Sequence, residues 1–241
     1  MLTGKVALVT GSSQGIGKET ASLLASYGAA VVICALDQQQ CEQVAAEIQA
    51  THHTPTLAIA CDVTDEQQVN AMIEKIAATL GPVDILINNA GAMLLKAFTE
   101  TTTAQWQHLF NVNVHAPFYL CQAVVPSMKA RGGGAIVNLA SIWGTKGGPD
   151  RSGYIASKHA TIGFSKALGE ELKPYQIRVN AVCPGPVDTA MTDALGDDLN
   201  KEGWLQPIDI AYVITDLVLP KNKAVTATSI EAFGAGRPVG L

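Results

Sequence analysis

The chain reads Val-Ala-Leu-Val-Thr-Gly-Ser-Ser-Gln-Gly-Ile-Gly over residues 6–17. Its short, continuous apolar start predicts a strand that is buried on both faces of a parallel sheet. The glycines that follow let the backbone turn sharply and come close to a pyrophosphate. A helix that begins near Gly15 would offer free N–H groups and the positive end of its dipole to that anion. The stretch therefore predicts the first strand, turn and helix of a dinucleotide-binding unit, although a tight turn without a ligand uses the same residues.

The alternation of strand and helix continues along the chain. Apolar runs predict strands near residues 5–10, 30–35, 56–61, 83–88, 134–140, 177–183 and 227–233, with helices between them and one long helix around 99–130. Right-handed crossovers then give an α/β fold, a doubly wound parallel sheet of seven strands in the order 3-2-1-4-5-6-7 with helices on both faces. Ligands bind such sheets beyond the carboxyl ends of the strands, where the order reverses.

The composition is that of one soluble domain. A chain of 241 residues, of which 48% are apolar, can bury a large core, and no linker divides it, so we expect a single domain over 1–241. The N-terminus lacks the apolar core of a signal peptide, and no apolar stretch approaches the roughly 20 residues of a membrane helix. We therefore expect a cytoplasmic protein.

Charge and cysteine usage argue against several kinds of partner. A net charge of −5 leaves no basic face for nucleic acid. The cysteines lack the spacing of a metal site or a disulfide frame, so we expect small buried side chains and no metal, nucleic-acid or membrane partner. They are Cys34, Cys41, Cys61, Cys121 and Cys183.

Tyr154 and Lys158 occur in the sequence Tyr-Ile-Ala-Ser-Lys, downstream of Ser141. On a helix this spacing places the phenol and the ammonium on one face, where a fixed cation favours the phenolate of a tyrosine. With the hydroxyl of Ser141 near enough to hold a carbonyl or alcohol oxygen, the three side chains would form an acid–base centre for hydride chemistry. The alternative is an exposed Tyr and Lys on an ordinary amphipathic helix.

These motifs together resemble the short-chain dehydrogenase/reductase family. They are Thr10-Gly11-x-x-x-Gly15-Ile16-Gly17, Asn88-Asn89-Ala90-Gly91, Ser141, Tyr154-x-x-x-Lys158 and Pro184-Gly185, in the family's order and spacing across nearly the whole chain. The resemblance, which extends to the 3-oxoacyl-acyl-carrier-protein reductases of the family, implies a single-domain Rossmann fold and a nicotinamide cofactor. It also implies a catalytic tetrad of Asn113, Ser141, Tyr154 and Lys158, in which Asn113 holds a water behind Lys158 and Lys158 lowers the pKa of Tyr154.

The resemblance further assigns the cofactor to the strand ends. The side chain of Asp62 and the backbone of Val63 would contact the adenine, although the segment after Asp62 could simply start the next helix. Val187 and Thr189 would clamp the nicotinamide carboxamide, and Asn89 would either bind the cofactor or tie neighbouring loops together. The full expected set is Gly11, Ser13, Gln14, Gly15, Ile16, Gly17, Asp37, Asp62, Val63, Asn89, Ala90, Gly91, Tyr154, Lys158, Pro184, Gly185, Val187 and Thr189.

The choice between NAD and NADP depends on the end of the second strand. An acidic side chain there accepts hydrogen bonds from the ribose of NAD, whereas the phosphate of NADP needs Arg or Lys. Gln14 and Leu36 stand where NADP-using relatives carry a basic residue, and Asp37 would repel a phosphate. NAD is therefore favoured over NADP, although Ala35 stands where NAD-using relatives most often have Asp, and Asp37 could simply cap the following helix.

The expected substrate residues are mostly apolar: Met93, Ile142, Trp143, Tyr154, Pro186, Met191 and Trp204. They predict a hydrophobic or aromatic-bearing ketone or secondary alcohol, with core packing as the alternative for each Met and Trp. The short stretch 190–206 would leave the pocket open to a carrier-linked 3-oxoacyl thioester, and Lys146 and Arg151 lie in a neighbouring loop.

Two expectations concern the whole molecule. Family members commonly form dimers or tetramers, so a homo-oligomer is expected in which the helices that carry Asn113 and Tyr154 pack against copies of themselves, unless one chain covers both. A catalytically silent NAD(H)-binding sensor or scaffold is the alternative from another functional class. The complete set of Asn113, Ser141, Tyr154 and Lys158 argues against it.

Overall fold

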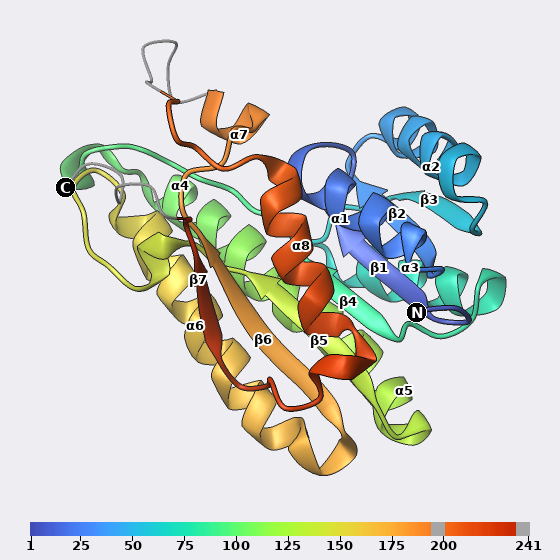
Figure 1. Ribbon diagram of the computed structural model, residues 1–241. Helices are drawn as coiled ribbons and strands as arrows, with labels where there is room; N and C mark the ends of the chain where they lie inside the picture. Colours follow the sequence, from blue (N-terminus) through green and yellow to red (C-terminus); the bar gives the residue numbers. More distant parts are fainter. Residues whose placement is uncertain (194–200, 235–241) are drawn as a thin grey trace.

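The chain folds around one parallel sheet of seven strands in the order β3-β2-β1-β4-β5-β6-β7 (Figure 1). The structure is a computed structural model that describes residues 1–193 and 201–234. The strands are β1 Val6–Thr10, β2 Ala30–Ala35, β3 Thr56–Ala60, β4 Ile85–Asn88, β5 Gly134–Leu139, β6 Ile177–Pro184 and β7 Ser229–Ala232. The fold class and the strand order predicted from the sequence are confirmed.

Helices cover both faces of the sheet. They are α1 Gly15–Ser26, α2 Gln38–His52, α3 Glu66–Thr79, α4 Thr103–Phe110, α5 Ala116–Arg131, α6 Ser152–Leu172, α7 Ala190–Asp193 and α8 Pro207–Val218. One apolar cluster joins the sheet to α1, α2 and α8, and the other joins it to α3, α5 and α6. Figure 1 shows α8 crossing in front of the sheet next to α1.

The strands supply both clusters because successive side chains point to opposite faces. In β1, Ala7 and Val9 belong to the cluster under α1 and α8, whereas Val6 and Leu8 belong to the one under α3 and α5. This double burial explains why β1 reads as a continuous apolar run. The cysteines are free and buried, as expected from their spacing.

The helix expected around 99–130 begins later and is interrupted. Thr102 ends the preceding loop as an N-cap, because its side chain accepts from the backbone N–H of Gln105 while the Gln105 side chain accepts from the N–H of Thr102. A single π-helical turn, Asn111–His115, then joins α4 to α5. Such turns widen the helix locally and are frequent at functional sites. Here the turn contains Asn113.

The start of β4 is tied to two other segments by Asp84. Its carboxylate accepts from Arg131 Nη1 at 2.7 Å, from Lys5 Nζ at 3.2 Å and from the backbone N–H of Val6 at 2.9 Å. Arg131 also donates to the carbonyl of Val83 at 2.6 Å. The side chain of Asp84 is only 12% exposed, so its carboxylate is largely desolvated and depends on these partners.

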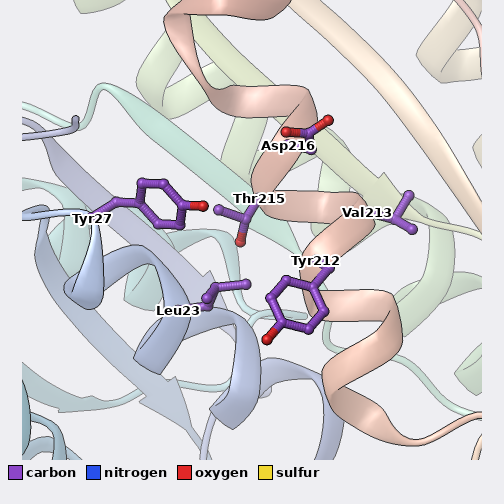
Figure 2. Close-up of a pocket in the computed structure, with 6 residues that line it drawn as sticks. All are labelled: Leu23, Tyr27, Tyr212, Val213, Thr215 and Asp216. Carbon is purple, nitrogen blue, oxygen red and sulfur yellow. The ribbon is translucent and has the colours of Figure 1, made fainter.

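A shallow hollow of about 280 Å³ lies on the surface between α1 and α8 (Figure 2). It is lined by Leu23, Tyr27, Tyr212, Val213, Thr215 and Asp216. Asp216 pairs with Lys221 at 2.8 Å, and the buried hydroxyl of Thr215 has no hydrogen-bond partner among the described residues.

Among the described residues, every helix is either too short or too polar to span a membrane.

We expect Asp84→Ala to lower the free energy of unfolding by about 2 kcal/mol, because it leaves Arg131 and the N–H of Val6 without their acceptor. Urea denaturation measures the change. Glu47→Ala is the matched control: Glu47 pairs with Lys18 at 2.6 Å, but its side chain is 45% exposed, so its loss should change the free energy of unfolding far less than Asp84→Ala does. Equal effects of the two substitutions would contradict the structural role of Asp84.

Candidate active site

A cavity of about 290 Å³ opens at the carboxyl ends of the strands. It collects predicted residues from segments that are far apart in the sequence. Those that line it are Ile16, Asn89, Gly91, Met93, Ser141, Ile142, Trp143, Tyr154, Lys158, Pro184, Gly185, Pro186, Val187, Thr189, Met191 and Trp204. The predicted residues outside this lining are Gly11, Ser13, Gln14, Gly15, Gly17, Asp37, Asp62, Val63, Ala90 and Asn113.

The glycine turn after β1 has a backbone that other residues would disfavour. Gly11 and Gly15 have φ values of +62° and +56°, in the left-handed region. A Cβ on Gly17 would lie 2.3 Å from the carbonyl oxygen of Gly11, so only glycine permits this approach. No side chain caps the first turn of α1 at Gln14. Its N–H groups can therefore receive an anion, and the turn fits the pyrophosphate of a dinucleotide.

Side-chain hydrogen bonds hold this turn in place. Asn89 Nδ2 donates to the carbonyls of Thr10 and Gly11, at 2.9 Å each. The hydroxyl of Thr10 in turn accepts from the backbone N–H groups of Asn89 and Ala90 at 3.1 Å. The side chain of Asn89 thus ties the loop after β4 to the loop after β1, which is one of the two roles expected for it.

Ser141 and Tyr154 both line the cavity. Ser141 follows β5 and accepts from the backbone N–H of Trp143 at 3.2 Å, whereas Tyr154 lies in the first turn of α6 and is 8% exposed. Burial raises the pKa of the Tyr154 phenol above its usual value. The hydroxyl of Ser141 and the positive charge of Arg151 oppose this shift.

Lys158 lies one turn further along α6 and is also buried. Its Nζ donates to the carbonyl of Leu139 at 2.8 Å and lies 5.7 Å from the ring centroid of Tyr154. Burial lowers the pKa of Lys158 to about 8. Desolvation is thus the main cause of both pKa shifts. Lys158 was expected to lower the pKa of Tyr154, but in the free protein the net shift of the Tyr154 pKa is upward.

Asn113 lies behind this pair, in the π-helical turn. Its Oδ1 accepts from the backbone N–H of Ala92 at 2.9 Å, and its Nδ2 donates to the carbonyl of Ala92 at 2.9 Å and to Ser157 Oγ at 3.0 Å. Its own carbonyl accepts from Thr161 Oγ1 at 3.0 Å. Asn113 therefore joins the loop after β4 to α6.

Comparison with known proteins gives the same assignment. The short chain dehydrogenase family matches residues 5–200. The chain belongs to this family. It is 36% identical to the 3-oxoacyl-(acyl-carrier-protein) reductase of Chlamydia muridarum over 89% of this chain and 86% of that one, and 33% identical to the one of Thermotoga maritima over 97% and 98%. A short-chain type dehydrogenase/reductase from Mycobacterium marinum superposes with a TM-score of 0.91, at 33% identity over 97% of this chain and 95% of that one.

Membership of the short-chain dehydrogenase family fixes the general chemistry. The chain is an oxidoreductase that acts on CH–OH groups with a nicotinamide cofactor. The cavity lies at the position where a doubly wound sheet binds its ligands.

Two acidic residues expected at the cofactor have local partners. Asp37 follows β2 and caps α2, because its carboxylate accepts from the N–H of Gln40 at 2.9 Å. The carboxylate of Asp62 accepts from the N–H and the hydroxyl of Thr64, at 2.9 and 2.7 Å. Each bond uses one oxygen of an exposed carboxylate, and the helix-capping interpretation of Asp37 describes the structure correctly.

The loop after β6 forms the opposite wall. Gly185 lies so close to Phe233 that a Cβ on it would be 2.5 Å from Phe233 Cβ. The carbonyl of Val187 accepts from Thr192 Oγ1 at 2.8 Å, and Thr189 approaches Gly15 of the glycine turn. The loop therefore faces the turn across the crevice.

Sequence reasoning missed part of the lining: Ala92, Leu95, Leu139, Ala140, Arg151 and Thr192. Leu139 and Ala140 directly precede Ser141, so their place at the strand end was a usable signal. Arg151 was noted only as a residue of a nearby loop. Its position one helical turn before Tyr154 was the signal that could have placed it in the cavity.

We expect Lys158→Met to stabilise the free protein at pH 7 by about 2 kcal/mol, because burying the ammonium costs more than its hydrogen bond to Leu139 contributes. The pKa is lowered from 10.5 to about 8, so below pH 8 the ammonium is charged in both states and the full cost is present. Between pH 8 and 10.5 the folded lysine loses its proton first, and the advantage of the variant should fade.

Urea denaturation at pH 7 and at higher pH measures this difference. Lys166→Met is the control, because Lys166 lies on the same helix with an exposed side chain. A Lys158→Met variant that is less stable than the unchanged protein at every pH would show that burial does not penalise this ammonium.

Proposed function

We propose that the chain interconverts a ketone and a secondary alcohol by hydride transfer, with NAD(H) favoured as the cofactor and residues 1–241 acting as one domain. The observation that supports this most directly is the convergence of Ser141, Tyr154 and Lys158 on one cavity. The glycine turn and the loop after β6 wall the same crevice. A bound nicotinamide would supply or accept the hydride at its ring.

The side chains divide the remaining work. Ser141 holds the substrate oxygen and stabilises the charge that develops on it. Tyr154 donates a proton to the oxygen during reduction and removes one during oxidation. Because burial raises the pKa of Tyr154, the phenol is protonated at neutral pH and is ready to donate. Lys158 holds the nicotinamide ribose and adds positive charge near the phenol.

Asn113 is a positioning residue in this proposal. Its carboxamide is already bonded to Ala92 and Ser157, so any water behind Lys158 would be held by its backbone carbonyl or by its neighbours. The two contacts to Ala92 hold the loop after β4, which lines the cavity. Asn113 thereby sets the distance between this loop and Lys158.

The preference for NAD rests on Asp37 and on Gln14 and Leu36, which are not cations. Leu36 is 76% exposed next to Asp37, where a phosphate-binding side chain would be needed for NADP. Asp37 caps α2 with only one of its carboxylate oxygens, so a ribose hydroxyl can still donate to the other oxygen. The charge would repel a ribose phosphate.

The substrate is expected to have an apolar body, because Met93, Trp143, Met191 and Trp204 line the cavity. A second candidate is the reduction of a 3-oxoacyl thioester, which is the activity in the names of the relatives from Chlamydia muridarum and Thermotoga maritima. A silent NAD(H)-binding scaffold is disfavoured, because Asn113, Ser141, Tyr154 and Lys158 are all present.

We also propose a homo-oligomer, a dimer or a tetramer. Along α5, Leu120 and Val124 are buried against the sheet, but Phe118 remains 46% exposed. One chain thus leaves part of this apolar helix uncovered.

We expect Tyr154→Phe to lower kcat at least about 100-fold, because the variant has no proton to exchange with the substrate oxygen. Initial rates over a panel of ketones, and a titration of NADH by fluorescence, measure turnover and cofactor affinity separately. Cofactor affinity should stay close to that of the unchanged protein. Tyr175→Phe, at an exposed position over Lys129, is the control. Substantial turnover by Tyr154→Phe would refute the assignment of the acid.

We expect higher initial rates with NADH than with NADPH at equal concentration. Asp37→Ser removes the charge but keeps a helix cap, so it should lower the NADH-to-NADPH ratio of kcat/KM about tenfold. Asp65→Ser makes the same change at the N-cap of α3, away from the cavity, and should leave the ratio unchanged. A strong preference of the unchanged protein for NADPH would overturn the argument from Asp37.

A further inference from the structure

Arg151 is a cation of the cavity wall that the proposed hydride transfer does not use. It is the N-cap residue of α6, its side chain is partly buried, and it lines the same cavity as Ser141 and Tyr154. Its positive charge affects Tyr154: burial raises the pKa of the phenol, and the charge of Arg151 lowers it in part. Any anion bound at Arg151 would therefore lie close to the reacting atoms.

Two contacts hold the guanidinium of Arg151 in place, one at its face and one at its Nε. Its Cζ lies 4.2 Å from the ring centroid of Trp143, and Nε donates to the carbonyl of Pro149 at 2.9 Å. The indole is supported by Gly148, where a Cβ would lie 2.6 Å from the Trp143 ring. The loop is further tied by the N–H of Lys96, which donates to the carbonyl of Asp150 at 2.6 Å.

These contacts leave the outer edge of the guanidinium unused. Neither Nη1 nor Nη2 of Arg151 has an ion pair or hydrogen bond with a residue in 1–193 or 201–234. A guanidinium that stacks on an aromatic ring can still bind a carboxylate through two parallel N–H groups in its plane. The guanidinium is thus pre-organised, with the N–H groups of Nη1 and Nη2 available to an anion.

The charge of the cavity also favours an anion. Among the described residues that line it, Arg151 and Lys158 are cations and none is Asp or Glu. The remaining polar side chains, such as Ser141 and Thr189, are neutral. In a partly desolvated cavity, two cations without a carboxylate produce a positive potential that attracts a negatively charged ligand.

We propose that Arg151 binds a carboxylate of the substrate, so that the substrate is a short oxo acid and the product the corresponding hydroxy acid. The inference rests on the proposed hydride transfer and narrows its substrate class. The cavity of about 290 Å³ must also admit the nicotinamide ring, which leaves room for a short chain. The apolar side chains that line the cavity would contact the carbon chain of the acid.

The reaction balances without any further reactant. The carbonyl carbon gains a hydride and the carbonyl oxygen gains the proton of Tyr154, so the ketone is reduced by two electrons at the expense of one dihydronicotinamide. Tyr154 then recovers a proton from solvent. The carboxylate keeps its charge throughout, and Arg151 only orients the acid.

The experiment compares each acid with its own neutral ester. We would measure kcat and KM with NADH for 2-oxopentanoate, 3-oxopentanoate and 4-oxopentanoate, and for their methyl esters. Calorimetry would measure binding of the same acids to the protein saturated with NAD, where no reduction can occur. We expect at least one acid to exceed its ester in kcat/KM by about tenfold or more, because charge-assisted bidentate bonds are worth that much.

Three variants assign the effect to Arg151. Arg151→Met keeps the length of the side chain but not its charge, and it should raise KM and weaken binding of the preferred acid about 10- to 100-fold, with its ester unchanged. Arg151→Lys should recover part of the loss. Lys146→Met is the matched control, because Lys146 lies in the same loop over the ring of Phe233 and outside the cavity lining. It should behave like the unchanged protein.

The outcomes separate this inference from the proposed function. Esters that turn over as well as the acids would overturn the carboxylate site and leave hydride transfer standing. An equal fall of kcat for acids and esters in Arg151→Met, with a shifted pH profile, would overturn it too, because Arg151 would then act only on Tyr154. Acids that bind through Arg151 while no ketone of either kind is reduced would support the carboxylate site and overturn the hydride transfer.

Discussion

The site depends on the burial of a phenol and an ammonium at the end of one sheet. Tyr154 and Lys158 are 8% and 5% exposed, and burial pushes both toward their neutral forms. Burial raises the pKa of the Tyr154 phenol above its usual value and lowers the pKa of the Lys158 ammonium to about 8. In the free protein burial therefore favours the protonated phenol. Additional positive charge nearby would favour the phenolate.

A buried polar network keeps these two side chains facing the cavity. Asn88 donates to Asn138 at 2.7 Å, and Asn138 donates to Ser165 at 2.8 Å, which connects β4, β5 and α6 through the core. Asn113 makes a second connection from the π-helical turn to Ser157 on α6. Buried amides that lose their partners are costly, so such a network strongly favours one arrangement of the helix on the sheet. The register of α6 is therefore determined by polar contacts as well as by apolar packing.

Much of this could be predicted from the sequence, and the reasons are local. Continuous apolar runs predicted the strands, and right-handed crossovers predicted their order. The glycines predicted the turn that ends in Gly17, because few other residues satisfy its backbone. The helix boundary was wrong by a few residues, since the capping box at Thr102 competes with an apolar pattern that begins earlier. The directions in which the pKa values of Tyr154 and Lys158 shift were not predictable, because they depend on burial rather than on spacing. The stacking of Arg151 on Trp143 depends on the path of the loop between them, which no periodicity encodes.

The charge of the whole molecule and that of the cavity have opposite signs, and this limits how an anionic substrate could be selected. A net charge of −5 repels anions at a distance, but salt screens such repulsion beyond roughly 8 Å. Inside the cavity, Arg151 and Lys158 act in a partly desolvated space where screening is weak. Recognition of a carboxylate would thus occur only at contact and would owe little to long-range steering. Discrimination between an acid and its ester should then appear mainly in how long the ligand stays bound, since the encounter rate carries little of the charge dependence.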